Sequence, residues 1–152
     1  MRGLLLVAIA GCTHYEPGSY ALWGPWSGTR IALPCLDLAV SVAREQPLTG
    51  PVVSYNFGNR CDHDVTVDLS SASVVARDAQ GRELHLSAYD PGGQIRPAAL
   101  PALLTGSERI EYNGDFAERA LVQVCVDVGA IDRSGDAQAR WICSGDRLEA
   151  AR

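Results

Sequence analysis

Two stretches of regular alternation between apolar and other side chains constrain the fold of this chain more than any other feature. In 36–44 (LDLAVSVAR) aliphatic residues occupy every second position, and 51–59 (PVVSYNFGN) repeats the alternation with larger apolar side chains. Successive side chains of a strand point to opposite faces, so a period of two indicates strands with one buried face. The intervening residues 45–50 are long enough for an antiparallel return.

The pattern continues in shorter pieces through the rest of the chain. Further strands are expected at 65–69, 74–75, 84–86, 110–112, 121–128 and 140–143. The turn 78–81 joins two of them as a hairpin, with Gly81 supplying a positive φ. No segment keeps a period of 3.6, although 96–104 and 115–120 are each able to form a helical turn. The sequence therefore predicts an all-β, antiparallel fold of seven or eight strands.

The length and pattern of this region resemble a known architecture. About 115 residues run from Cys35 to residue 148, just beyond the last expected strand, a length similar to that of immunoglobulin-like domains. The stretch Val53-x-Tyr55-x-Phe57-x-Asn59 is also similar to small sandwich domains of bacterial secreted proteins, such as those resembling the intracellular proteinase inhibitor of bacilli. These resemblances imply an antiparallel immunoglobulin-like β-sandwich, and they imply no inhibitory site.

The first twelve residues have the organisation of an export signal. Met1 and Arg2 supply positive charge, 3–10 (GLLLVAIA) is apolar, and Gly11 precedes Cys12. The apolar run is far shorter than the roughly 20 residues that a membrane-spanning helix needs. The alternative is that 3–10 forms a buried first strand and that Cys12 is an ordinary core thiol.

The segment Ile9-Ala10-Gly11-Cys12 resembles the lipobox of bacterial lipoproteins. In that family the Cys thiol receives a diacylglyceryl group, the signal is cleaved directly before the Cys, and the new N-terminus is acylated as well. The resemblance therefore implies that Cys12 carries membrane lipid. Two or three acyl chains are enough for stable anchoring, whereas one chain gives only marginal binding.

The resemblance also implies how the chain is divided into segments and where in the cell the protein is located. It implies a signal peptide at 1–11, the lipidated Cys and a tether at 12–34, a β-sandwich domain at 35–148 and a tail at 149–152. In lipoproteins of enteric bacteria an Asp after the acylated Cys favours the inner membrane. Thr13 occupies that position here, so we expect a lipid anchor in the bacterial outer membrane, with the domain facing the periplasm or the exterior.

The expected tether contains more aromatic residues than a plain spacer. Residues 13–29 are rich in Pro and Gly but include Tyr15, Tyr20, Trp23 and Trp26. One interpretation is that the segment lies back on the domain and covers a sheet face or edge. The other is that the aromatic side chains rest at the lipid headgroup layer. The first is favoured, because exposed aromatic side chains are costly in a soluble segment.

Four cysteines remain once the lipidated one is set aside, and an even number in an exported chain indicates two disulfides. Three pairings are possible. Cys35 and Cys61 are symmetric about the first expected return, and Cys125 and Cys143 about the last, so each pair is able to face its partner across two antiparallel strands. We therefore expect Cys35–Cys61 and Cys125–Cys143. Zinc is the alternative, but no C-x-x-C spacing is present.

Charge and motifs exclude several functions. The formal net charge is −5, all 13 basic residues are Arg, and no long run of like charge occurs, so nucleic acid is not an expected partner. Asp62-His63-Asp64 is a weak candidate for a cation site, but a solvated turn is favoured because neighbouring strand residues point to opposite faces. The common nucleophile, phosphate-loop, dinucleotide and metalloprotease motifs are absent from the sequence. We expect no enzyme activity, no cofactor and no metal site.

Two functions from different classes remain. The favoured one is a membrane-anchored lipoprotein that acts as a non-catalytic binding or structural module of a cell-envelope assembly, with another envelope protein as its partner. The alternative is a periplasmic domain that binds a small ligand or inhibits a protease through the Pro/Gly-rich loop 87–99, where Asp90, Gly92 and Gly93 are the candidate binding residues. The first is favoured because a shallow sandwich offers edges more readily than deep pockets.

Overall fold

The computed structural model describes residues 14–22, 28–44, 50–114 and 121–144, and these residues form an all-β, antiparallel fold. The strands are β1 (Thr29–Ala32), β2 (Leu36–Arg44), β3 (Pro51–Asn59), β4 (Val65–Val67), β5 (Ser73–Asp78), β6 (Glu83–Ala88), β7 (Ala98–Leu100), β8 (Thr105–Asn113), β9 (Leu121–Asp127) and β10 (Trp141–Ser144), with one 3₁₀ turn at Leu69–Ser71. The all-β, antiparallel prediction is confirmed for this part of the chain, whereas the expected seven or eight strands are ten, because the short strands β1 and β7 were not foreseen. The expected signal and Cys12 lie outside the described residues.

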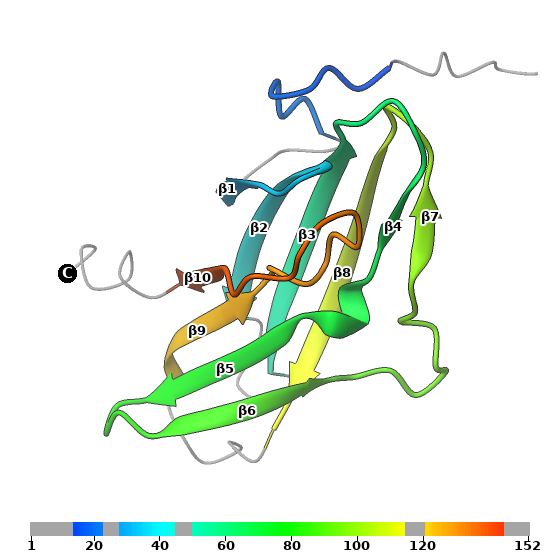
Figure 1. Cartoon of the computed structure of the whole chain (residues 1–152). Coiled ribbons are helices and arrows are strands. Elements are labelled where there is room, and N and C mark those ends of the chain that lie inside the picture. The colour runs from blue at the N-terminus through cyan, green and yellow to red at the C-terminus, as the bar shows by residue number, and fades with distance from the viewer. Residues whose placement is uncertain (1–13, 23–27, 45–49, 115–120, 145–152) are drawn as a thin grey trace, which may run out of the picture.

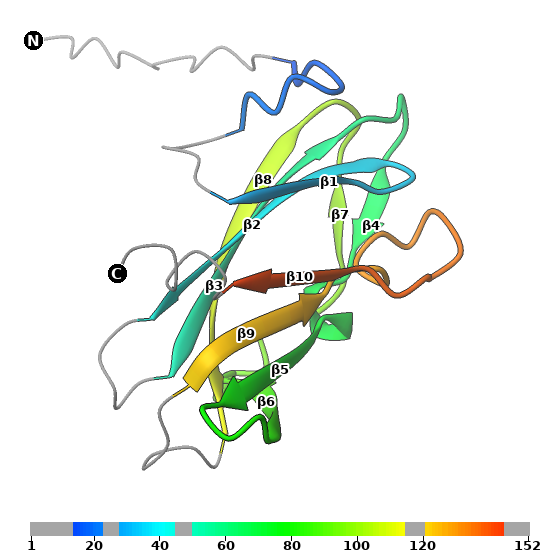
Figure 2. The same ribbon diagram turned by 90° about the vertical axis from the view of Figure 1, so that its left-hand side faces the viewer.

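Eight of these strands form one sheet in the order β1-β2-β3-β8-β6-β5-β9-β10, and β4 pairs separately with β7. The large sheet curls until β10 approaches β2, so that it is nearly closed (Figures 1 and 2). Its two halves are joined where β6 pairs with β8 through Ser87–Asn113 and Ala88–Tyr112. This continuous pairing gives one curled sheet instead of the two clearly separate sheets of the expected immunoglobulin-like sandwich.

The alternation in β3 has the expected consequence for the core. Val53 and Tyr55 are fully buried, and Phe57 is buried opposite Gly106 of β8. The hydroxyls of Tyr55 and Tyr112 lie 2.8 Å apart and satisfy each other, while burial raises the pKa of both phenols. Gly106 on β8 leaves room for the Phe57 ring, because a Cβ there would lie 2.9 Å from the ring Cζ.

Two short strands differ from the expectation. β1 lies inside the segment interpreted as tether and pairs with β2 from Thr29–Val40 to Ala32–Asp37. The helical turn expected at 96–104 is wrong, because part of that segment forms β7 and pairs with β4. The other helical turn, expected at 115–120, lies outside the described residues.

The loop 128–140 is fastened to the domain by two buried carboxylates. The guanidinium of Arg133 donates from Nε to Asp68 Oδ2 at 2.9 Å, and Asp132 Oδ2 accepts from the backbone N–H of Cys35 at 2.6 Å. These bonds join the last loop to segments that are distant in sequence. Among the described residues, no helix has the length and apolar character needed to cross a membrane.

Candidate functional site

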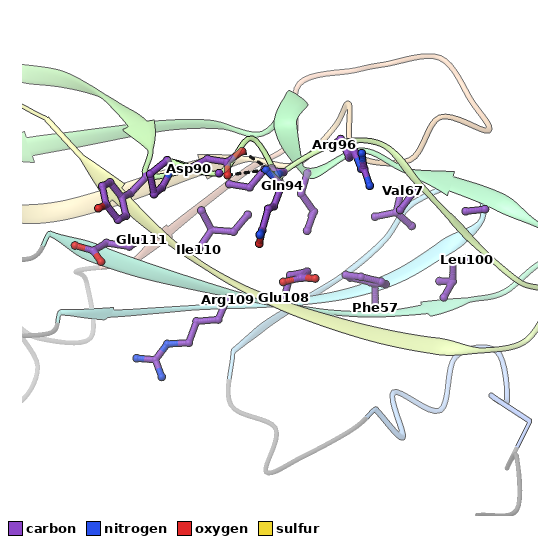
Figure 3. A pocket seen from close by; sticks show the side chains of 17 residues that line it. Phe57, Val67, Asp90, Gln94, Arg96, Leu100, Glu108, Arg109, Ile110 and Glu111 are labelled. Atoms are coloured by element: carbon purple, nitrogen blue, oxygen red, sulfur yellow. Dashed lines mark hydrogen bonds between the residues drawn. The ribbon is translucent and has the colours of Figure 1, made fainter.

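An open groove of about 720 Å³ lies between β8 and the segment that connects β6 to β7 (Figure 3). We name it the β8 groove. Large apolar side chains from β3, β4, β7 and β8 form its floor, and polar and charged side chains surround them. The lining residues are Phe57, Val67, Leu69, Tyr89, Asp90, Pro91, Gly92, Gln94, Ile95, Arg96, Ala98, Ala99, Leu100, Glu108, Arg109, Ile110 and Glu111.

The groove exists because the chain after β6 leaves β8 early. Pairing between the two strands covers only two residue pairs, and it is followed by one bond from the N–H of Tyr89 to the carbonyl of Glu111 at 2.7 Å. The chain then crosses to β4 and pairs with it as β7. Gln94 extends from this crossing segment towards β8, whereas Arg109 points to the other side of the strand (Figure 3).

Asp90 shapes the crossing segment from within. Its Oδ1 accepts from the N–H of Gln94 at 2.7 Å, and its Oδ2 accepts from the N–H of Ile95 at 2.9 Å. The N–H of Gly93 donates to the Asp90 carbonyl at 3.2 Å, and Gly93 has a φ of +60°, which favours glycine. Both carboxylate oxygens of Asp90 therefore hold the turn that forms one wall of the groove.

The three candidate binding residues have different positions relative to the groove. Asp90 and Gly92 line it, whereas Gly93 forms the turn and is not among the lining residues. A ligand role for them stays a prediction. The apolar floor was not foreseen, although Ile95 and Leu100 carry a signal: each is a large aliphatic residue in a segment otherwise rich in Pro, Gly and small side chains.

Charges of both signs surround the apolar floor. Arg96 is exposed, and no hydrogen bond or ion pair joins it to another residue in the described part of the chain. Glu108 is exposed on β8, and Glu111 is half-buried further along the same strand. Arg96 and Glu108 therefore offer one cationic and one anionic side chain to a molecule in the groove, whereas Glu111 shares the strand face of Arg109.

The four cysteines form the two expected disulfides, Cys35–Cys61 and Cys125–Cys143. His63 lies near the first, with its ring nitrogen within 4.8 Å of both sulfur atoms. A metal would need these sulfur atoms as thiolates, and the disulfide removes that chemistry. The side chain of Asp62 is exposed, and its bond to His63 lowers the pKa of its carboxyl.

The expected tether is partly built into the domain. Tyr15 is only 3% exposed, its N–H donates to the Leu103 carbonyl at 2.7 Å, and its hydroxyl donates to Asp37. The N–H of Gly18 donates to Asp37 Oδ2 at 2.6 Å, and Arg60 Nε lies 3.4 Å from Asp37 Oδ1.

The Tyr15 ring also lies directly on Gly58, where an added Cβ would meet three ring carbons at 2.5–2.7 Å. We name Tyr15, Gly18, Asp37, Gly58 and Arg60 the Tyr15 cluster. Burial, followed by the bond to Asp37, raises the pKa of the Tyr15 phenol.

For two of the tether aromatics, these contacts favour packing on the domain over a position at the lipid headgroup layer. Tyr15 packs on the domain, and Tyr20 lies under the guanidinium of Arg30, 5.0 Å from Arg30 Cζ to the ring centroid. Trp23 and Trp26 lie outside the described residues. Sequence reasoning identified the unusual aromatic content but had no means of finding Asp37 and Gly58 as its partners.

Comparison with known proteins finds similar structures in Bacillus subtilis. The yjhA protein matches with a TM-score of 0.49 and 10% sequence identity over 75% of this chain and 94% of its own. The ycdA protein, described as a candidate lipoprotein, matches with a TM-score of 0.47 and 14% identity over 82% of this chain. This chain spans 41% of the length of ycdA. No family model matches the sequence, and no curated protein matches it.

Proposed function

We propose that this protein is an exported, lipid-anchored and non-catalytic binding module whose β8 groove takes an extended segment of another cell-envelope protein. The observation that carries the proposal is the groove itself, an open space of about 720 Å³ with an apolar floor beside a long strand. The lipobox resemblance and the two disulfides support export to an oxidising compartment.

The shape of the groove favours an extended peptide. β3 pairs with β8 from Gly58–Thr105 to Val52–Glu111, whereas β6 pairs with β8 only at its end. A peptide that lies along β8 places alternate side chains towards the floor, and recognition beside a strand is a recurrent mode of peptide binding. Phe57 and Ile110 offer such side chains an apolar surface. Arg96 and Glu108 would then set the direction and charge pattern of the bound segment.

The test is to fill the groove without disturbing the core. Gln94 is exposed and extends towards β8, so Gln94→Trp occupies the space that a peptide would use. Gln80, an exposed residue of the β5–β6 turn, gives the matched control Gln80→Trp. Proteins that co-purify with each variant from solubilised membranes are quantified, and synthetic peptides from the recovered partner are then titrated against each variant.

The proposal expects one envelope protein that is retained by the wild type and Gln80→Trp and is depleted by Gln94→Trp. It also expects one of its peptides to bind with at least about tenfold lower affinity to Gln94→Trp, since losing about 1.4 kcal/mol is a factor of ten. Equal recovery and equal peptide affinity for both variants would contradict it.

A second candidate function is small-ligand binding, and the groove volume favours it, because ligand pockets commonly occupy about 300–1,000 Å³. Native mass spectrometry of the detergent-extracted protein distinguishes it: a bound species of small mass that Gln94→Trp loses and Gln80→Trp keeps supports this candidate over the peptide. Protease inhibition through 87–99 is the related possibility, and it predicts that the loop survives incubation with the protease it blocks.

The anchor has its own test. Mass spectrometry of the membrane fraction is expected to find the mature protein starting at an acylated Cys12, and a Cys12→Ala variant is expected to lack the lipid. Density-gradient separation of the two membranes then tests the outer-membrane address implied by Thr13. A retained Met1 with an unmodified Cys12 would contradict both the anchor and the address.

A further inference from the structure

The Tyr15 cluster also bears on how the domain is positioned at the membrane. This inference rests on the lipid attachment proposed for Cys12. We propose that the cluster holds one end of the domain, formed by 14–20, 58–62 and 101–104, against the lipid headgroup layer. The β8 groove would then extend from this end away from the membrane, towards a partner.

The argument starts from the length of chain between the lipid and the first docked residue. Tyr15 follows Cys12 by three positions, and three residues span at most about 10 Å. Without the cluster, the chain from Cys12 to the start of β1 at Thr29 would extend to on the order of 60 Å and would have a root-mean-square span of about 23 Å. The docked Tyr15 therefore removes most of the freedom that a tether of this length would give.

About 10 Å is comparable to the headgroup region on one side of a bilayer. A domain held at that distance from the acyl chains has to contact the headgroups at the docking point. Contacts of the cluster define which end this is: the N–H of Tyr15 bonds to the carbonyl of Leu103, and its ring lies on Gly58. Residues 14–22 lie over the end of the sheet where the β3–β4 and β7–β8 connections meet (Figures 1 and 2).

The chemistry of this end suits contact with headgroups. The β7–β8 turn consists of Pro101, Ala102, Leu103 and Leu104, with the first exposed and the others half-buried. Leu103 has a φ of +53°, a conformation that a leucine rarely adopts, and this conformation accompanies the bond from Tyr15 to its carbonyl. The turn therefore presents a small apolar surface beside the anchor.

Charges at this end do not favour attraction to anionic lipid. Arg60 is paired with Asp37, and Asp62 and Asp64 are exposed on the neighbouring connection. The acyl chains and the short connection therefore have to hold this end at the membrane, without help from a basic patch. The groove starts next to this end, at Phe57 and Leu100, and extends outwards from it, because Glu108–Glu111 follow Thr105 by three to six residues of strand, about 10–20 Å.

Photo-crosslinking to lipid tests the orientation directly. A photoreactive amino acid replaces Ala102 in the β7–β8 turn or, as the matched control, Ala79 in the β5–β6 turn at the opposite end of the sheet (Figure 1). After irradiation of intact cells, lipid adducts on each purified protein are counted by mass spectrometry. The proposal expects several-fold more lipid adduct at position 102 than at position 79.

A length variant separates the cluster from the anchor. Inserting about ten Gly and Ser residues between His14 and Tyr15 adds roughly 17 Å of root-mean-square reach and leaves every cluster residue in place. Lipid adducts at position 102 are expected to fall to the level at position 79. Equal adducts at both positions in the acylated protein, or no change on insertion, would overturn the orientation while the proposed anchor stands. An unacylated Cys12 would overturn both.

Discussion

At the scale of single residues, Asp37, Asp68, Asp78 and Asp132 are buried, and each accepts at least one hydrogen bond from a main-chain N–H of a turn or loop. Arginines accompany three of them, as in the pairs Arg60–Asp37, Arg82–Asp78 and Arg133–Asp68. These hydrogen-bond donors stabilise each buried carboxylate in its charged form. Removing a donor leaves the charge buried with fewer partners, so its desolvation cost is no longer offset. These carboxylates therefore fix loops in place.

The contact between Gly58 and Tyr15 leads to the first prediction. Gly58→Ala is expected to destabilise the protein by about 1–3 kcal/mol, because the new Cβ would overlap the buried ring and displace it. Gly92→Ala is the control, since its Cβ would meet Gln94 at an ordinary 3.4–3.6 Å. Urea unfolding of both variants measures the difference. Equal midpoints would show that the Tyr15 ring does not occupy the Gly58 site.

Asp68 gives a prediction about pH. Burial acts to raise the pKa of this carboxyl, but the bonds from Ser70 and Arg133 outweigh it and hold the pKa below its ordinary value of 3.8. The charged form is thus favoured in the folded state, so the contribution of Asp68 to stability is fully present above about pH 4. It is lost as the pH falls towards the lowered pKa.

Removing the charge of Asp68 tests whether this carboxylate stabilises the folded state above about pH 4. Asp68→Asn is expected to lower the free energy of unfolding at neutral pH by about 1.5–3 kcal/mol, the usual value of hydrogen bonds to a charged group. It is also expected to flatten the decline of stability below pH 4. Urea midpoints measured from pH 2 to pH 7 check both effects. Asp136 is exposed, so the control Asp136→Asn is expected to match the wild type. If stability declined below pH 4 in Asp68→Asn as steeply as in the wild type, Asp68 would not be the group responsible.

At the scale of elements, long alternating runs were predictable and short ones were not. β2 and β3 have the predicted bounds, because nine residues of alternation allow little freedom of register. β1 and β7 have four and three residues, too few to show a period, and they are strands only because β2 and β4 supply partners. The curl of the sheet depends on the brief pairing of β6 with β8, which no local pattern marks.

The candidate site was likewise predictable only in part. The Pro and Gly content of 87–99 identified the segment that forms one wall of the groove. It did not show that Asp90 would use both oxygens on its own turn, since a carboxylate before Pro-Gly-Gly is equally compatible with ligand binding. The floor and the Tyr15 cluster arise from contacts between residues about 20 or more positions apart, which a single sequence does not reveal.

The two disulfides lead to a prediction about reduction. Both close loops of similar size, with sequence separations of 26 and 18. The chain-entropy model therefore gives each disulfide a stabilisation of about 3 kcal/mol. They differ in exposure: Cys143 is exposed on the edge strand β10, whereas Cys35 is buried and its N–H is bonded to Asp132. A thiolate has to reach a sulfur atom to attack it, so we expect Cys125–Cys143 to be reduced first.

Timed alkylation under mild reductant, followed by peptide mass spectrometry, measures the order. Labels are expected to accumulate on Cys125 and Cys143 while Cys35 and Cys61 remain paired. Denaturing the protein before reduction is the control, and it is expected to remove the difference because exposure then becomes equal. Simultaneous labelling of all four cysteines in the folded protein would contradict the prediction.

At the scale of the whole molecule, charge and anchor act in opposite directions. The formal net charge is −5 and no Lys is present, so the protein as a whole is repelled by an anionic lipid surface. The acyl chains proposed at Cys12 oppose this repulsion, at about 0.8 kcal/mol for each buried CH₂. The Tyr15 cluster then determines how close the negatively charged domain lies to the membrane.

This balance predicts how the protein leaves the membrane. Washing membranes with about 1 M NaCl, where the Debye length is about 3 Å, is expected to release none of the wild-type protein, because no attractive charge is screened and the repulsion weakens. Detergent that dissolves the bilayer is expected to release all of it. Quantitative immunoblotting of pellet and supernatant measures both fractions, with a peripheral basic protein as the salt-sensitive control. Substantial release by salt alone would show that attachment depends on a charged partner and not on the lipid, and the orientation imposed by the Tyr15 cluster would then have no anchor on which to act.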